Sequence, residues 1–203
     1  RGDPVALVAA DAARQVSRPP RSGSEHAETL LTQLSHLFEE LTDTVDTAAT
    51  RSGAGLLAAG APASDLVTLL DRVSIWHRRR SLVVLITDTA HPDPVLAPRV
   101  VDLLRRLSAQ HELTVIQIED DDPLAPGRAH DIELSGEVPA FLREDRALAA
   151  RVSQQVLARR AAVTGALDAR HIEYVTITDD ASLVDRIADL LARQRLASSK
   201  RRR

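Results

Sequence analysis

Few folds accommodate the unbroken run of five large aliphatic residues at 82–86, Leu-Val-Val-Leu-Ile. Successive side chains of a strand point to opposite faces, so this run suits a strand buried on both faces, as in a parallel sheet. The run ends in Thr87-Asp88-Thr89. Ligands of open α/β sheets bind just beyond the carboxyl ends of the strands, so Asp88 is the first candidate site residue. The alternative is that Asp88 only caps a loop before two prolines.

Further apolar runs alternate with helical patterns along the chain. Strands are predicted at 5–10, 113–118 and 172–178, and helices at 22–40, 64–77, 98–110, 145–169 and 182–195. This alternation predicts an α/β fold with a doubly wound, mainly parallel, Rossmann-like sheet flanked by helices. A polar strand at 14–18 is expected to return from the first strand as a hairpin.

The length and composition favour one globular domain over residues 1–196. Residues 41–63, rich in Thr, Asp, Ala and Gly, are expected to form a mobile or loosely helical connection. Lys200 to Arg203 are all basic, and residues 197–203 are predicted to be a disordered basic tail.

Composition excludes several classes of function. Aromatic residues make up only 2% of the chain, which argues against base stacking. The chain has no cysteine, so disulfides, zinc thiolate sites and thiol nucleophiles are excluded. The formal net charge is −3, and without the four basic residues of the tail it is −7. We therefore expect no nucleic-acid partner.

The sequence contains no apolar run near the roughly 20 residues that span a bilayer. Residues 1–20 carry charges throughout, unlike a signal peptide. The chain starts at Arg1 and contains no methionine, so we expect it to be a piece of a longer protein. We predict a cytoplasmic protein, with membrane association only through a segment that precedes Arg1.

The histidines do not form a metal-binding pattern. No two of the seven are spaced i, i+4, and the sequence contains no His-Glu-x-x-His motif. Serine-hydrolase elbows and Walker phosphate loops are also missing from the sequence. We expect most of the histidines to lie on the surface or partly buried in helices.

Oxygen-bearing side chains converge in the predicted topology. Asp88 and the run Glu119–Asp122 both leave strands at the carboxyl edge of the sheet. Ser64 and Asp65 open a helix that leads into the central strand, so they are expected at the same edge. Hard divalent cations such as Mg²⁺ prefer these oxygen ligands. The alternative is that Ser64 or Asp65 is an ordinary N-cap and the acidic run a solvated loop.

The order of these segments resembles the bacterial domain-of-unknown-function 58 family. The resemblance covers nearly the whole chain, through the segments Gly2–Ala9, Pro62–Leu66 with Leu69–Leu70, Arg79–Asp88, Val115–Asp120, and Ala158–Arg160 to Thr178–Asp179. It implies a domain like the von Willebrand factor type A (vWA) domain. Such domains use a metal-ion-dependent adhesion site to bind an acidic side chain of a partner.

The resemblance also assigns site residues. In that fold three loops build the site: an Asp-x-Ser-x-Ser motif after the first, central strand, a Thr, and an Asp. Ser64 matches the second position with a conservative replacement, Asp88 matches the third, and Asp65 would support the site beside Ser64. The first motif does not occur in this sequence, and its strand would precede Arg1. Strand 5–10 would then pair directly with strand 82–87, or a gap would expose an apolar edge that favours aggregation.

The function that the resemblance implies is a non-enzymatic interaction module with an incomplete adhesion site. Mg²⁺ would bind only together with the missing motif. The expected partner is a protein, a MoxR-type AAA+ ATPase. The alternative is a Mg²⁺-dependent phosphate-handling enzyme that uses Asp88 and the Asp120–Asp122 cluster, although no phosphate-cradling glycine loop accompanies them. A structural fragment without a working site is the third interpretation.

Overall fold

A computed structural model describes most of the chain. The described residues are 2–11, 13–52, 64–76, 79–95, 97–119, 130–131, 136–137, 145–179 and 181–201. The chain divides into two compact units, residues 1–76 with 123–146 and residues 77–122 with 147–203, and each is described by itself. The prediction of one domain over residues 1–196 stays a prediction.

The first unit begins with an antiparallel hairpin of β1 (Val5–Ala10) and β2 (Gln15–Arg21). Asp11 forms the turn, because its Oδ1 accepts hydrogen bonds from the N–H groups of the residues two and three positions later, at 2.8 and 2.6 Å. The prediction that β2 ends before Pro19 is wrong. The strand continues through two prolines to Arg21, as a strand at a sheet edge can.

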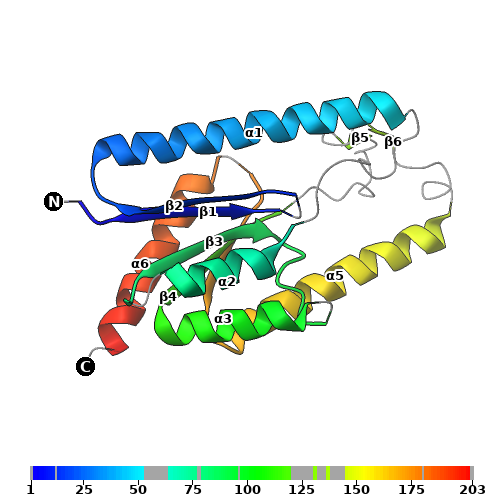
Figure 1. Cartoon of the computed structure of the whole chain (residues 1–203). Coiled ribbons are helices and arrows are strands. Elements are labelled where there is room, and N and C mark those ends of the chain that lie inside the picture. The colour runs from blue at the N-terminus through cyan, green and yellow to red at the C-terminus, as the bar shows by residue number, and fades with distance from the viewer. Residues whose placement is uncertain are drawn as a thin grey trace. The chain divides into compact units, whose positions relative to one another are not determined.

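The helix α1 (Ser24–Ser52) runs alongside this hairpin (Figure 1). Arg14 Nη1 donates to Glu40 Oε2 at 2.8 Å, and Arg18 also hydrogen-bonds a side chain of α1. We predicted that the helix ends near Glu40, and it is twelve residues longer. No glycine or proline interrupts residues 41–52, so propensity alone does not end the helix there. The remainder of the predicted connection, residues 53–63, lies outside the described residues.

The other elements of the first unit are shorter. α2 (Leu66–Trp76) packs against β1 and buries Leu66 and Leu70. β5 (His130–Asp131) and β6 (Gly136–Glu137) form a two-residue antiparallel pair.

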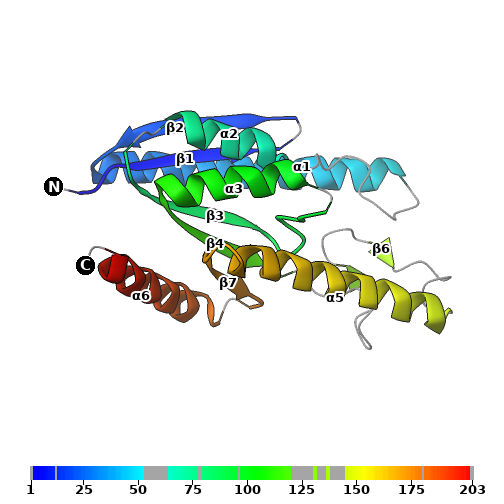
Figure 2. The same cartoon turned by 90° about the horizontal axis from the view of Figure 1, so that it is seen from below.

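The second unit is built on a three-stranded parallel sheet in the order β3 (Leu82–Asp88), β4 (Glu112–Ile118), β7 (Glu173–Ile177) (Figure 2). Asp88 pairs with Ile118, and Ile118 pairs with Ile177. The carboxyl ends of the three strands therefore meet at one edge. The prediction of an α/β fold with a parallel sheet is confirmed.

Helices cover the sheet of the second unit. α3 (Pro98–Gln110) packs against β4, and α5 (Arg146–Asp168) precedes β7. α6 (Leu183–Arg201) packs on β7 and β4, where Leu190 joins Ile116 and Ile177 in a buried cluster. Val115 and Ile116 are both buried, and they point to opposite faces, so β4 is covered on both sides.

The helix α6 is longer than we predicted. It continues through Arg201, whereas we expected a disordered tail from residue 197. None of the helices in the described part of the chain is long and apolar enough to cross a membrane.

β3 differs from the buried strand that its sequence predicts. Within the described residues it pairs only with β4 and so lies at a sheet edge, while β1 pairs with β2. Leu85 is buried, but Leu82, Val84 and Ile86 are 49%, 44% and 63% exposed. The prediction that β3 is buried on both faces is therefore wrong for one face. β1 and β3 belong to different units, so the choice between the two expected arrangements stays a prediction.

Candidate functional site

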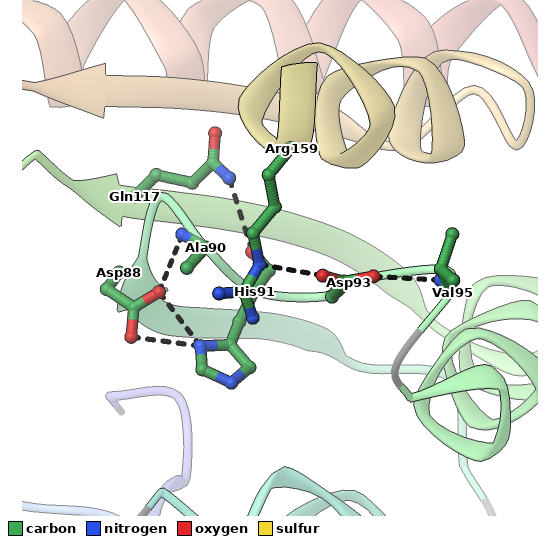
Figure 3. A network of polar contacts seen from close by, with 7 residues as sticks. All are labelled: Asp88, Ala90, His91, Asp93, Val95, Gln117 and Arg159. Atoms are coloured by element: carbon green, nitrogen blue, oxygen red, sulfur yellow. Dashed lines mark hydrogen bonds and ion pairs between the residues drawn. The ribbon is translucent and has the colours of Figure 1, made fainter. Parts of the chain in front are cut away.

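The candidate site lies where β3 ends. Asp88 is the last residue of the strand, and its Oδ1 accepts the backbone N–H of Ala90 at 2.7 Å. Both carboxylate oxygens also contact His91 Nδ1, at 2.8 and 2.9 Å (Figure 3). Because an ionised carboxylate only accepts, the imidazole Nδ1–H is the donor. Asp88 therefore makes its hydrogen bonds within the loop that follows the strand.

The surroundings of Asp88 favour its charged form. Burial raises the pKa of this carboxyl, but the hydrogen bond and charge of His91, the N–H of Ala90 and the charge of Arg159 together lower it below its ordinary value. The side chain is 35% exposed. The end of β3 therefore carries an ionised, partly accessible carboxylate at neutral pH.

The backbone of His91 is held by the neighbouring strand. Gln117 of β4 donates from Nε2 to the carbonyl oxygen of His91 at 3.3 Å (Figure 3). The Gln117 side chain is fully buried, and its Oε1 accepts the hydroxyl of Thr176 in β7 at 3.5 Å. A chain of polar contacts thus links all three strands to the loop after β3.

The same loop is fastened to α5. The buried Asp93 accepts a hydrogen bond on Oδ2 from Arg159 Nε at 2.7 Å. Its Oδ1 accepts the N–H of Val95 at 2.8 Å, and its carbonyl accepts the N–H of Ala97 at 3.0 Å. This ion pair fixes the path of the chain between β3 and α3.

Carboxylates also follow the other two strands. Glu119, after β4, pairs with Arg160 of α5, the residue next to Arg159. Asp179, after β7, accepts the N–H of Ser182 at 2.8 Å at the start of α6. The predicted Asp120–Asp122 cluster lies outside the described residues. Each strand of this sheet therefore ends at a carboxylate, or is followed by one, that has a defined partner.

Ser64 and Asp65 lie in the first unit, before α2. Asp65 is the helix cap, because its Oδ1 accepts the N–H of Thr68 at 3.0 Å. Ser64 is the residue before the cap and forms an isolated antiparallel bridge with Asp11. Ser64 and Asp88 belong to different units, so their shared site stays a prediction.

Asp88 fits a magnesium site as one ligand. Among the residues that the structure describes, no group of three or more His, Asp or Glu is arranged to hold a metal ion. Mg²⁺ prefers carboxylate oxygens but needs near-octahedral coordination. The donor type at Asp88 is therefore right for Mg²⁺, and further oxygens are needed to complete a site.

Sequence reasoning missed His91, Asp93, Gln117 and Arg159. His91 was grouped with histidines expected on the surface or in helices, although its position three residues after Asp88 is a usable signal. Asp93 and Arg159 are 66 residues apart, and no sequence pattern pairs them. Gln117 sits inside an apolar strand, where a buried amide usually has a hydrogen-bonding partner.

A family model described as "Protein of unknown function DUF58" matches residues 1–162. The matched range includes Asp88, His91, Asp93 and Arg159. Comparison with curated proteins and with solved structures finds no match.

Proposed function

Because the chain belongs to the DUF58 family, we propose that it is a non-enzymatic protein-interaction module of the vWA type. The observation that carries this proposal is the ionised Asp88 carboxylate at the carboxyl end of β3. This is the edge at which open α/β sheets bind their ligands.

The arrangement around Asp88 suits recognition. Gln117 holds the following loop at the His91 carbonyl, and Arg159 holds it at Asp93. A binding group whose supporting contacts are already made loses little conformational entropy when a partner arrives. His91 Nδ1 contacts both oxygens of Asp88, so the imidazole fixes the orientation of the carboxylate.

The family resemblance supports a metal-dependent form of this recognition. Asp88 and Ser64, with Asp65 beside Ser64 and an Asp-x-Ser-x-Ser motif, would hold Mg²⁺. The bound cation would supply positive charge that attracts a carboxylate of the partner. On the same resemblance, we propose a MoxR-type AAA+ ATPase as the partner. The two proteins would bind each other in the cytoplasm.

The test is capture of the purified ATPase by an immobilised protein that carries this chain together with the Asp-x-Ser-x-Ser motif, with Mg²⁺ and with EDTA. Asp88→Ala is expected to reduce the Mg²⁺-dependent capture at least about tenfold, as loss of a central charged contact does. The matched control is Asp179→Ala, which removes the carboxylate after β7 and should leave capture in place. Circular dichroism confirms that both variants are folded. Capture that survives both Asp88→Ala and EDTA would remove the proposal.

The phosphate-handling alternative is tested with the same variants. Phosphatase activity of the wild-type chain that is lost in Asp88→Ala, and kept in Asp179→Ala, would replace the interaction proposal. We expect no such activity.

A further inference from the structure

We propose that Arg159 of α5 is a positioning residue for the Asp88–His91 pair. This inference rests on the proposed function, because it assigns the residue that orients the proposed binding group. In the described part of the chain, Arg159 forms no hydrogen bond with Asp88. It acts through Asp93, which it pairs with at 2.7 Å (Figure 3).

The first step of the argument is the burial of Asp93. Its side chain is 7% exposed, whereas that of Arg159 is 39% exposed. A carboxylate withdrawn from water requires hydrogen bonds and a compensating charge. Removal of the cation from such a pair is more disruptive than loss of an exposed ion pair. The position of Asp93 is therefore expected to depend on Arg159.

The second step links Asp93 to the chain on either side. On the side of α3, Asp93 accepts the N–H groups of Val95 and Ala97, at 2.8 and 3.0 Å. On the side of β3, only the buried Pro92 separates Asp93 from His91. The proline ring fixes the φ angle of that connection. A displacement of Asp93 is therefore transmitted to His91.

The third step links His91 to Asp88. The imidazole contacts both carboxylate oxygens, and Gln117 holds the His91 carbonyl. The ring is thus placed by two supports, Gln117 on β4 and the Asp93–Arg159 pair on α5. Without the second support, the loop is expected to open locally and the imidazole to leave Asp88 for part of the time.

The experiment is amide hydrogen exchange by NMR on the whole chain, without any partner. Arg159→Gln is expected to speed the exchange of the Ala90, Val95 and Ala97 amides at least about tenfold, because local opening exposes them. The amide of Val115 in β4 should keep its wild-type rate. The ¹⁵N shifts of the His91 ring should also change, because they report the hydrogen bond at Nδ1. A merely stabilising role would leave these shifts as they are in the folded protein.

The matched control is Arg193→Gln. Arg193 also uses Nε to approach a carboxylate, Glu173, at 3.5 Å, and the two side chains are 50% and 37% exposed. This variant should leave the loop amides and the His91 shifts unchanged. Arg159→Lys, which keeps the charge, should restore part of the wild-type protection.

A second variant covers the case in which Arg159→Gln does not fold. Asp93→Asn keeps an oxygen that can accept the N–H of Val95 but loses the charge that pairs with Arg159. It should speed exchange at Ala90 and shift the His91 signals in the same direction. Wild-type exchange and wild-type His91 shifts in a folded Arg159→Gln or Asp93→Asn variant would overturn the assignment. Because these readouts need no partner, their failure is distinct from a failure of the ATPase capture.

Discussion

The carboxylate of Asp88 makes two kinds of hydrogen bond in the loop after β3. It caps the loop after β3 by accepting the N–H of Ala90, and it holds an imidazole with both oxygens. The loop cap is therefore observed, and the interpretation that Asp88 only caps a loop stays a prediction. The capping role also fixes the carboxylate at the sheet edge where the proposed partner would meet it.

The lowered pKa of Asp88 gives a prediction for acid stability. Its folded-state value lies below the unfolded value of about 3.9, so its stabilising contribution is present above that pH. The contribution is lost as the pH falls through the lower, folded-state value. Asp88→Asn should therefore show a shallower fall in the free energy of unfolding as the pH falls below about 4. Urea unfolding at a series of pH values measures this, and equal slopes for the two proteins would contradict it.

The cap of α2 provides a second prediction. Asp65→Ala should lower the free energy of unfolding by about 1 kcal/mol, because the Thr68 N–H loses its acceptor. Ser64→Ala is the control, since Ser64 precedes the cap, and we expect a change within about 0.5 kcal/mol. Chemical denaturation of both variants checks this. The reverse order of effects would show that Ser64 is the cap.

At the scale of elements, β3 shows what its sequence can and cannot specify. The five aliphatic residues predict a strand, and the strand forms at residues 82–88. The sequence of β3 does not specify how many strands pair with it, because that number depends on segments elsewhere in the chain. α1 extends past the predicted end at Glu40 for a different reason, because residues 41–52 contain no glycine or proline that would stop the helix. Long elements are predictable from their periodicity, whereas edges and ends depend on tertiary context.

The exposed face of β3 leads to a prediction about solubility. Leu82, Val84 and Ile86 form an exposed apolar row on an edge strand, an arrangement that promotes association. Ile86→Lys should lower the aggregation rate of the purified chain, and the stability should change by less than about 0.5 kcal/mol. Light scattering during storage measures this. Val184→Lys, at an exposed position on α6, is the control that should change aggregation little. Equal improvement by both variants would indicate a general charge effect.

At the scale of the whole molecule, the order of strands and helices was sufficient to predict an α/β fold with a parallel sheet. It also placed Asp88 at the end of a strand beside the ends of β4 and β7, as observed. The contacts that hold the loop could not be predicted, because Arg159 pairs with Asp93 across 66 residues. The meeting of Ser64 with Asp88 stays a prediction, because the two residues lie in separate units.

The affinity for the purified MoxR-type ATPase tests the central role of Asp88 most directly, when it is measured on the purified protein that carries this chain together with the Asp-x-Ser-x-Ser motif. Titration calorimetry in Mg²⁺ should show that Asp88→Asn, which keeps the shape of the side chain but removes its charge, raises Kd at least about tenfold. EDTA should weaken binding of the wild-type chain by a similar factor. A Kd that is the same for the two proteins, with and without Mg²⁺, would contradict the account.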